Sequence, residues 1–322
     1  MNNKEVYTTG NSFRAIAEAN AREYRKSILQ LTVFDKYGHI LDNIDAEKGM
    51  NFLPSLRNEI LDEVKKRNSL GKGIDMVRTT KNMLSSQAMC FNLFAPLNKD
   101  LAFATQFFKQ LLGNVSKITK KIQYEYTPSK TIFNDQSGRG GVDCDSLLTY
   151  TNDIGQESIL VIETKYVEPD FSNCGFRKRD HDDRCPLNTI LEPDLSNCRY
   201  HYKKRYNYWK VAEESNLFNM DLITRNPCPF GGHLWQLWTN MSLAYALAKE
   251  KGISEYYYAV VCPEENDMLS NNGKIFDMFR DLLKYPEKFK VIYLSDIKLA
   301  FDTIDNKGFN KDWTNEFIQR YC

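Results

Sequence analysis

Two charged residues at the end of an apolar strand are the first sign of chemistry in this chain. The stretch 157–166 reads "ESILVIETKY", and its four consecutive branched apolar residues, 159–162, are typical of a strand covered on both faces. Side chains alternate along a strand, so Glu163 and Lys165 lie on one face, together with the first and third of these apolar residues. A carboxylate and an ammonium on the inward side of a buried strand indicate an active site.

A second carboxylate is expected opposite the first. The strand pattern "VDCDSLLTY" (142–150) precedes 157–166, and "TNDIGQ" between them reads as a turn. If this turn closes a hairpin centred near Ile154, the positions of paired residues add up to 308. Asp145 then lies opposite Glu163, with their Cβ atoms roughly 4.5 to 5.5 Å apart on the same face.

Two opposed acids on a buried face need a counter-charge. Burying them without one would cost several kcal/mol or force one of them to keep its proton. A divalent cation between the carboxylates removes this problem, and hard oxygen ligands suit Mg²⁺ or Mn²⁺. Lys165 reaches the same site. Two alternatives remain open: Asp143, which has the same parity, could replace Asp145, and Glu163 with Lys165 could form an ordinary salt bridge at a strand end.

An acid followed by Glu-x-Lys at the end of the next strand, with Gly-rich sequence ("SGRGG") before it, resembles the PD-(D/E)xK nuclease superfamily. Three further stretches are similar to a bacterial restriction-endonuclease family within that superfamily. They read "LSSQAMCFNLFAPL" (84–97), "RYNYWKVAEESNLF" (205–218) and "HLWQLWTNMSLAYALA" (233–248). The resemblance covers roughly residues 84 to 262 in separate blocks. Residues 1–50 and the C-terminal helices add nothing to it.

The resemblance implies a restriction-endonuclease-like α/β fold, in which a mixed β-sheet core is flanked by helices. It also implies Mg²⁺- or Mn²⁺-dependent hydrolysis of DNA phosphodiester bonds, in restriction or defence against foreign DNA. Asp145 and Glu163 would ligate the metal. Lys165 would orient or deprotonate the attacking water and stabilise charge on the phosphorane.

Two more catalytic candidates follow from the resemblance. The superfamily often adds an acid from a preceding helix, for which Glu59 in "LRNEILDEV" is the candidate, although it could be a solvated helix residue. A Gln on a later helix is also common, and Gln236 fits. Three positions after it, where a basic residue is expected, this chain has Thr239. Gln236 and Asn240 lie at i and i+4 on a mostly apolar helix, so they are either functional or a satisfied core pair.

A basic and aromatic segment is the candidate nucleic-acid surface. "RYHYKKRYNYWK" (199–210) holds five Lys or Arg residues and five aromatics, with no acid. The predicted phosphate contacts are Lys203, Lys204, Arg205 and Lys210. The alternative of equal weight is a solvated amphipathic helix, with the tyrosines and tryptophan in the core.

The eight cysteines raise the question of a second metal. A structural zinc site could be formed by Cys174, Cys185, Cys198 and His201. The spacings are wide and include no Cys-x-x-Cys pair, so we favour buried free thiols in a loop. An intracellular chain is not expected to carry a disulfide framework.

The element pattern predicts one α/β core with a helical N-terminal elaboration. Helices are expected at 11–30, 52–68, 75–94, 99–112, about 199–215, 233–250 and 270–284. Strands are expected from 117 and at 142–150, 157–166, 256–262 and 289–294, with two short helices closing the chain. Residues 1–98 would form a helical region packed on the core, and residues 99–322 the nuclease core, with a Cys-containing insertion at about 168–198.

Length, charge and hydropathy bear on the location and partners of the protein rather than on its chemistry. The chain has 322 residues and a formal net charge of +1, so any polyanion site must be a local patch. No apolar run reaches the roughly 18 to 20 residues that span a bilayer, and no signal core precedes the first helix, so we expect a cytoplasmic protein without a membrane partner. Because cutting both strands of DNA takes two sites, we expect a homodimer. A non-catalytic nucleic-acid-binding protein and an assembly subunit on the same fold are the alternatives.

Overall fold

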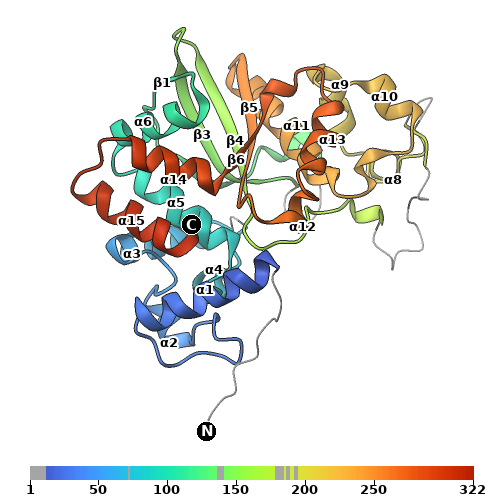
Figure 1. Ribbon diagram of the computed structural model, residues 1–322. Coiled ribbons are helices and arrows are strands. Elements are labelled where there is room, and N and C mark those ends of the chain that lie inside the picture. The colour runs from blue at the N-terminus through green and yellow to red at the C-terminus, as the bar shows by residue number, and fades with distance from the viewer. Residues whose placement is uncertain (1–11, 72, 136–140, 178–184, 186–188, 192–194) are drawn as a thin grey trace.

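A six-stranded mixed sheet forms the centre of the molecule (Figure 1). The computed structural model describes residues 12–71, 73–135, 141–177, 185, 189–191 and 195–322. The strands run in the order β1-β3-β4-β5-β6, and β2 also pairs with β3. Their bounds are β1 (Val115–Lys117), β2 (Gln123–Tyr126), β3 (Cys144–Asn152), β4 (Glu157–Thr164), β5 (Glu255–Cys262) and β6 (Phe289–Tyr293).

The hairpin β3–β4 has the register that the turn predicted. Ser146 pairs with Ile162 and Leu147 with Val161, so paired positions add up to 308. Gly155 in the turn has a φ of 82°, which suits a residue without a Cβ. Strands β1, β2 and β4 are antiparallel to β3, whereas β5 is parallel to β4 and β6 is parallel to β5.

Helices cover both faces of the sheet, as Figure 1 shows. One apolar core joins the even-numbered side chains of β3 and β4 to the N-terminal helices and the last two helices. A second apolar core lies on the other face and joins odd-numbered side chains of the same strands to the helices between β4 and β6. The helices of the first group are α1 (Phe13–Ser27), α2 (Asn43–Glu47), α3 (Arg57–Ser69), α4 (Met76–Lys81), α5 (Ser86–Leu97), α6 (Leu101–Leu112), α14 (Leu294–Thr303) and α15 (Phe309–Tyr321). The others are α7 (Lys130–Phe133), α8 (Arg199–Tyr202), α9 (Tyr208–Ser215), α10 (Met220–Arg225), α11 (Leu234–Lys251), α12 (Asp267–Ser270) and α13 (Lys274–Asp281).

Helix α11 is the centre of the second core. Twelve of its eighteen residues are buried, and it packs on both β4 and β5. Trp238 on this helix contacts the rings of Trp209 and Phe230. This packing holds the first turns of α11 over the end of β4, where the predicted active site lies.

The fold class was predicted correctly, but several elements are interrupted. The helix predicted at 75–94 is two helices, because Asn82 is extended and the Ser85 side chain caps the amide of Ala88 at the start of α5. The strand predicted from 117 is likewise two strands, β1 and β2. Helix α10 was not predicted.

The helix predicted at 199–215 is also broken, into α8 and α9. Arg205 lies between them with a φ of 54°, which ends helical geometry. Tyr206, Tyr208 and Trp209 are all buried in the second core, and positions i, i+2 and i+3 do not share one face of a helix. Tertiary packing of these rings therefore overrides the helical spacing.

The N-terminal helices do not have a core of their own. Residues of α1, α3 and α5 belong to the same apolar cluster as β3, β4 and the C-terminal helices. The predicted division at residues 98 and 99 stays a prediction, and residues 137–140 of the Gly-rich loop lie outside the described part of the chain. Within that part, none of the helices is long and apolar enough to cross a membrane.

Candidate active site

The two strand-end acids lie where the hairpin register puts them. Continuing the β3–β4 ladder by one residue beyond Ser146 and Ile162 sets Asp145 opposite Glu163. An Asp145 carboxylate oxygen accepts a hydrogen bond of 2.6 Å from the backbone amide of Thr164. Glu163 is 5% exposed. The carboxylates therefore meet at the end of β4, on the face that α11 covers.

Three side chains hold the Glu163 carboxylate from the same face. Gln236 donates its amide Nε2 to Oε1 at 2.7 Å, and Asn240 donates Nδ2 to Oε2 at 2.9 Å. The Lys165 ammonium lies 2.8 Å from Oε1. Gln236 and Asn240 are one helical turn apart on α11, so the helix presents both amides to one carboxylate. Donors to both oxygens hold the Glu163 carboxylate in one orientation.

Gln236 is itself fixed in place. Its side-chain oxygen accepts a hydrogen bond from the backbone amide of Ser172 at 2.9 Å. Thr239, which stands where a basic residue was expected, is fully buried and donates its hydroxyl to the Gln236 carbonyl at 3.1 Å. The space beside Gln236 is therefore packed, and a long cation at 239 would have to displace core side chains.

Lys165 is a buried cation surrounded by acids. Its side chain is 10% exposed, and its ammonium lies 5.7 Å from the centre of the Phe171 ring. Burial lowers the pKa of Lys165, but Glu163, Glu168 and Asp145 together outweigh it, so the pKa is raised above its ordinary value. Lys165 therefore stays charged at neutral pH.

Glu168, another of these acids, belongs to a hydrogen-bond network. It accepts hydrogen bonds from the Arg78 guanidinium, from the Ser86 hydroxyl at 2.6 Å and from the amide of Tyr166 at 2.8 Å. These bonds connect the segment after β4 to α4 and to the first residue of α5. They fix the chain just beyond Lys165.

A third acid, which the sequence did not reveal, extends the row. The β2–β3 register pairs Tyr124 with Ser146 and Tyr126 with Cys144, so Glu125 stands beside Asp145 on its other side. Glu125 is 5% exposed and accepts a hydrogen bond of 2.6 Å from the Gln87 side-chain amide. Its φ of 44° is unusual for a strand residue and redirects its side chain. Glu125, Asp145 and Glu163 therefore belong to three adjacent strands at one level of the sheet.

Two carboxyl groups of this row, those of Asp145 and Glu125, resist ionisation. Burial raises the pKa of Asp145 well above its usual range, and the charges of Glu163 and Glu125 raise it further. Burial also raises the pKa of Glu125, to about 8, with Asp143 and Glu163 contributing and the Gln87 amide opposing. Asp143 precedes β3 and lies close to Glu125, since a Cβ on Gly73 would meet both carboxylates within 3.1 Å. One lysine does not neutralise this many acids.

A divalent cation fits the chemistry of this site. Its donors are carboxylate oxygens, and the acids of the row outnumber its one lysine. Across the described residues, no group of three or more His, Cys, Asp or Glu side chains surrounds one ion position. The protein would therefore supply one or two carboxylates and leave other positions to water and substrate, as is usual for Mg²⁺.

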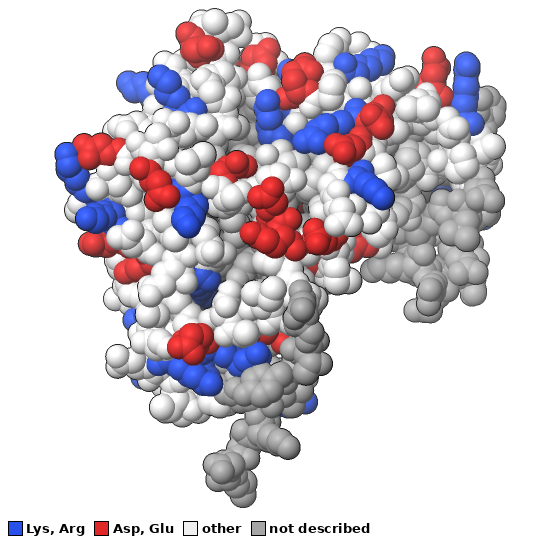
Figure 2. Space-filling view, viewed as in Figure 1, with Lys and Arg blue, Asp and Glu red and all other residues white. Residues whose placement is uncertain are grey.

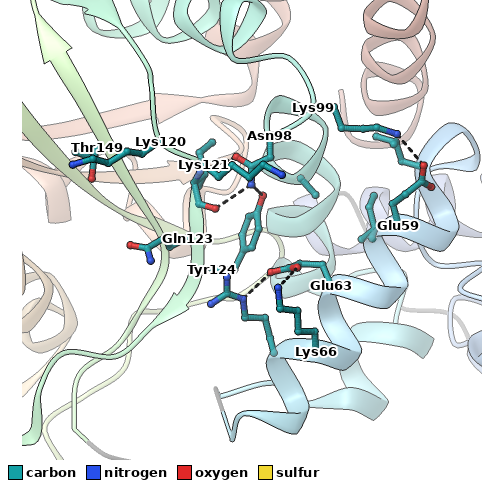
Figure 3. A pocket seen from close by; sticks show the side chains of 15 residues that line it. Glu59, Glu63, Lys66, Asn98, Lys99, Lys120, Lys121, Gln123, Tyr124 and Thr149 are labelled. Carbon is teal, nitrogen blue, oxygen red and sulfur yellow. Dashed lines mark hydrogen bonds and ion pairs between the residues drawn. The ribbon is translucent and has the colours of Figure 1, made fainter.

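Glu59 does not join the acids. It lies on α3, its side chain is 57% exposed, and its carboxylate pairs with the Lys99 ammonium at 2.9 Å (Figure 3). No hydrogen bond or ion pair described for Glu59 reaches Asp145, Glu163 or Lys165. The resemblance suggested Glu59 as an acid from a preceding helix, but its side chain lines a separate cavity. We therefore leave Glu59 out of the proposed site.

The predicted phosphate contacts at 203–210 lie on the surface. Lys203, Lys204 and Arg205 are exposed in the turn between α8 and α9, and Lys210 is exposed on α9, where its ammonium is 3.9 Å from Glu214. Their contact with nucleic acid stays a prediction.

The predicted zinc ligands gather only in part. Burial raises the pKa of the Cys174 thiol to about 12, and the neighbouring Cys198, Cys228 and Cys185 raise it further. Cys228, rather than His201, is thus the fourth member of this group, and the ring Nδ1 of His201 is buried with no hydrogen-bond partner among the described residues. The described cysteines form no disulfide, and within the described residues no group of three or more His, Cys, Asp or Glu side chains surrounds a metal position. The group therefore consists of free thiols: Cys198 is buried and accepts a hydrogen bond from the Trp209 indole N–H at 3.2 Å, and the other three are half-buried.

Comparison with models of protein families matches residues 11–322 to the PD-(D/E)XK nuclease superfamily. The chain belongs to this superfamily. The match includes most of the N-terminal region and the C-terminal helices, in which the sequence alone showed no resemblance. The mixed sheet flanked by helices agrees with a restriction-endonuclease-like fold. Neither the curated proteins nor the solved structures include a match to the chain. Membership in the PD-(D/E)XK superfamily indicates nuclease activity.

Proposed function

We propose that the protein is an endonuclease that hydrolyses DNA phosphodiester bonds with Mg²⁺ or Mn²⁺ at Asp145, Glu163 and Lys165. The observation that carries this proposal is the opposition of two strand-end carboxylates with a buried lysine bound to one of them. Membership in the nuclease superfamily supports the same reaction class.

Asp145 and Glu163 would hold the metal between them. A bound divalent cation would polarise the scissile phosphate and make a bound water more acidic. The raised pKa of Asp145 supports this role, because a cation is the counter-charge that lets both carboxylates ionise together. Glu125 lies beside the same position, and a bound cation would favour its ionised form as well.

Lys165 would act as a cation rather than as a base. Its pKa is raised above the ordinary value, so at neutral pH it has no free lone pair with which to take a proton from water. A charged ammonium can instead donate a hydrogen bond to the attacking water or to a phosphate oxygen and stabilise charge in the transition state. The proton of the water would leave to solvent or to the substrate phosphate.

Gln236 and Asn240 would be positioning residues. Both donate to Glu163 and neither needs to touch substrate. Side chains that orient a metal-binding carboxylate typically contribute 10- to 100-fold to metal affinity or activity.

The biological setting follows from the family alone. Restriction or defence against foreign DNA, action as a homodimer and a cytoplasmic location are proposals that rest on membership in the superfamily and on the two sites needed to cut both strands. We prefer DNA to RNA on the same basis.

Purified protein should be incubated with supercoiled plasmid, and in parallel with RNA, in Mg²⁺, in Mn²⁺ and in EDTA. We expect nicking or linearisation of the plasmid with either metal and none with EDTA. Glu163→Gln should abolish it, and the matched control Glu287→Gln, at an exposed position far along the chain, should not. Plasmid cleavage that survives in Glu163→Gln would place the chemistry elsewhere, and DNA binding without cleavage in any metal would favour a non-catalytic binding protein.

A further inference from the structure

A cavity of about 480 Å³ lies beside the sheet edge, and Glu125, Asp145 and Glu163 are not among the residues that line it. Helix α3, the end of α5 and the chain leading into β2 form its walls (Figure 3). Neither the nuclease chemistry nor the core packing gives it a role. Its volume is in the range of pockets that bind small molecules or parts of larger ligands.

The lining of this cavity is rich in cations. Five Lys or Arg side chains and two acids line it, so the lining carries a formal charge of +3. The cations are Lys66, Arg67, Lys99, Lys120 and Lys121. The whole chain has a net charge of only +1, and on the face shown in Figure 2 acidic and basic side chains are interspersed, with acids gathered near the centre. The cavity is therefore a local site of positive charge.

The two acids of the cavity are already neutralised by neighbours. Glu63 accepts from the Arg67 guanidinium at 2.8 Å, and Glu59 pairs with Lys99 at 2.9 Å. Lys66 lies 3.9 Å from Glu63, which makes this ion pair a loose one, and its side chain is 68% exposed. Lys121 is exposed and makes no ion pair within the described residues. Lys66 and Lys121 thus keep donors for an incoming anion.

The floor of the cavity is apolar and rigid. Ile60 and Ile122 form part of it. The Asn98 amide bridges it by donating to the Ile122 carbonyl at 3.0 Å and to the Tyr124 hydroxyl at 2.7 Å, and the Asn98 side-chain oxygen accepts from the Ile122 amide. A preformed apolar floor under a cationic rim matches a nucleotide unit, which combines a flat base with an anionic phosphate.

The cavity adjoins the acid row along β2. Tyr124 lines the cavity and the next residue is Glu125. Gln123, also in the lining, pairs with Leu147, two residues from Asp145. Two strand residues span roughly 7 Å, which is close to the spacing of neighbouring phosphates along one DNA strand.

We propose that this cavity binds a phosphate-bearing nucleotide unit, and that its occupant is a nucleotide of the DNA substrate that flanks the bond to be cut. The inference rests on the proposed function for its choice of substrate. The cavity would hold the nucleotide next to the scissile phosphate and so fix which bond meets the acids. The same chemistry could be supplied by a free nucleotide, and the experiment separates the two sources.

DNA binding is measured on a background that cannot cut. Glu163→Gln protein is titrated against a fluorescently labelled DNA duplex at several NaCl concentrations, with and without the pair Lys66→Gln and Lys121→Gln. We expect the pair to weaken binding at least about tenfold and to make the slope of log K against log [NaCl] less negative by about 1.8, because two phosphate contacts are lost. The matched control pair is Lys298→Gln and Lys311→Gln, two exposed helix lysines outside the cavity, and should change neither quantity.

A second titration measures the binding of dAMP by isothermal titration calorimetry. DNA affinity that falls only in the cavity pair assigns the cavity to the substrate strand. DNA affinity that is unchanged, with dAMP binding that the cavity pair abolishes, supports the site with a free nucleotide as its source. If the cavity pair matches the control pair for both ligands, the inference is overturned. Failure of the proposed function would give a different result, because the parent protein itself would neither bind nor cut DNA. The dAMP titration would then be the test of whether the cavity binds a nucleotide.

Discussion

Two glutamate–lysine pairs in this molecule have almost the same geometry and opposite surroundings. Glu163 and Lys165 are 2.8 Å apart with side chains 7% and 10% exposed, whereas Glu59 and Lys99 are 2.9 Å apart with side chains 57% and 46% exposed. Both glutamates are plausible nuclease acids by sequence. Distance between partners therefore does not distinguish an active site from a surface salt bridge, and burial among other charges does.

The two pairs differ in how far water screens their charges. An exposed pair is screened and contributes about 0 to 1 kcal/mol to stability. At the strand ends, water is excluded and further acids surround the pair, so each charge depends on its neighbours.

Removing the buried lysine should have the largest effect. Lys165→Ala is expected to lower the single-turnover rate of DNA cleavage at least about 100-fold, since a preorganised donor to the transition state is lost. The matched control Lys249→Ala, which breaks the exposed pair with Glu214, should leave the rate within about twofold. A rate in Lys165→Ala close to that of the control would remove Lys165 from the chemistry.

The amides on α11 should matter next. Gln236→Leu and Asn240→Leu are each expected to weaken Mn²⁺ binding or lower the cleavage rate by about 10- to 100-fold, because Glu163 loses a donor that orients it. The KM for DNA should stay unchanged, which separates positioning from substrate binding. A thermal melt checks that the variants are folded, and a loss confined to KM would argue against the positioning role.

Glu125 gives the site a pH-dependent stability in the absence of metal. Its folded-state pKa is about 8, above the ordinary value of 4.5, so between these pH values the folded state binds more protons than the unfolded state. Stability in EDTA should then fall as the pH rises from about 4.5 to about 8. Glu125→Gln should flatten this fall and melt at a higher temperature than the parent at pH 8.5. If the parent and Glu125→Gln differ in melting temperature by the same amount at pH 5 and at pH 8.5, folding does not raise the pKa of the Glu125 carboxyl.

Breaking the exposed pair should have the smallest effect. Glu59→Gln is expected to change the free energy of unfolding by no more than about 1 kcal/mol and to leave the cleavage rate at saturating DNA within about twofold. Urea unfolding and single-turnover cleavage measure the two quantities. A large loss of rate would return Glu59 to the active site and would mean that burial is the wrong criterion.

The sequence predicted the parts of the site that local rules determine. A short turn after β3 set the hairpin register, and strand alternation then put Asp145, Glu163 and Lys165 on one face. Gln236 was predicted from the resemblance, and its spacing from Asn240 came from helical periodicity. The fold class followed from the order of elements.

Other parts depended on tertiary structure. Glu125 was missed because the connection from β2 to β3, residues 127–143, is too long to set a register, and because its positive φ breaks the alternation of the strand. Glu59 was proposed because the superfamily often adds an acid from a preceding helix, and the sequence does not say what that side of the helix contacts. Gln87 lies in a stretch that matched the family, but its contact with Glu125 comes from packing between α5 and β2.

Metal binding by the carboxylate pair is the central claim, and Mn²⁺ tests it without a nucleic acid. Free Mn²⁺ is followed by electron paramagnetic resonance during titration of the parent protein, Asp145→Asn and the control Asp302→Asn, an exposed acid on α14. We predict that the parent and the control bind Mn²⁺ with the same affinity and that Asp145→Asn, folded by its melting curve, loses that site. Equal Mn²⁺ binding by all three proteins would contradict the proposed metal site.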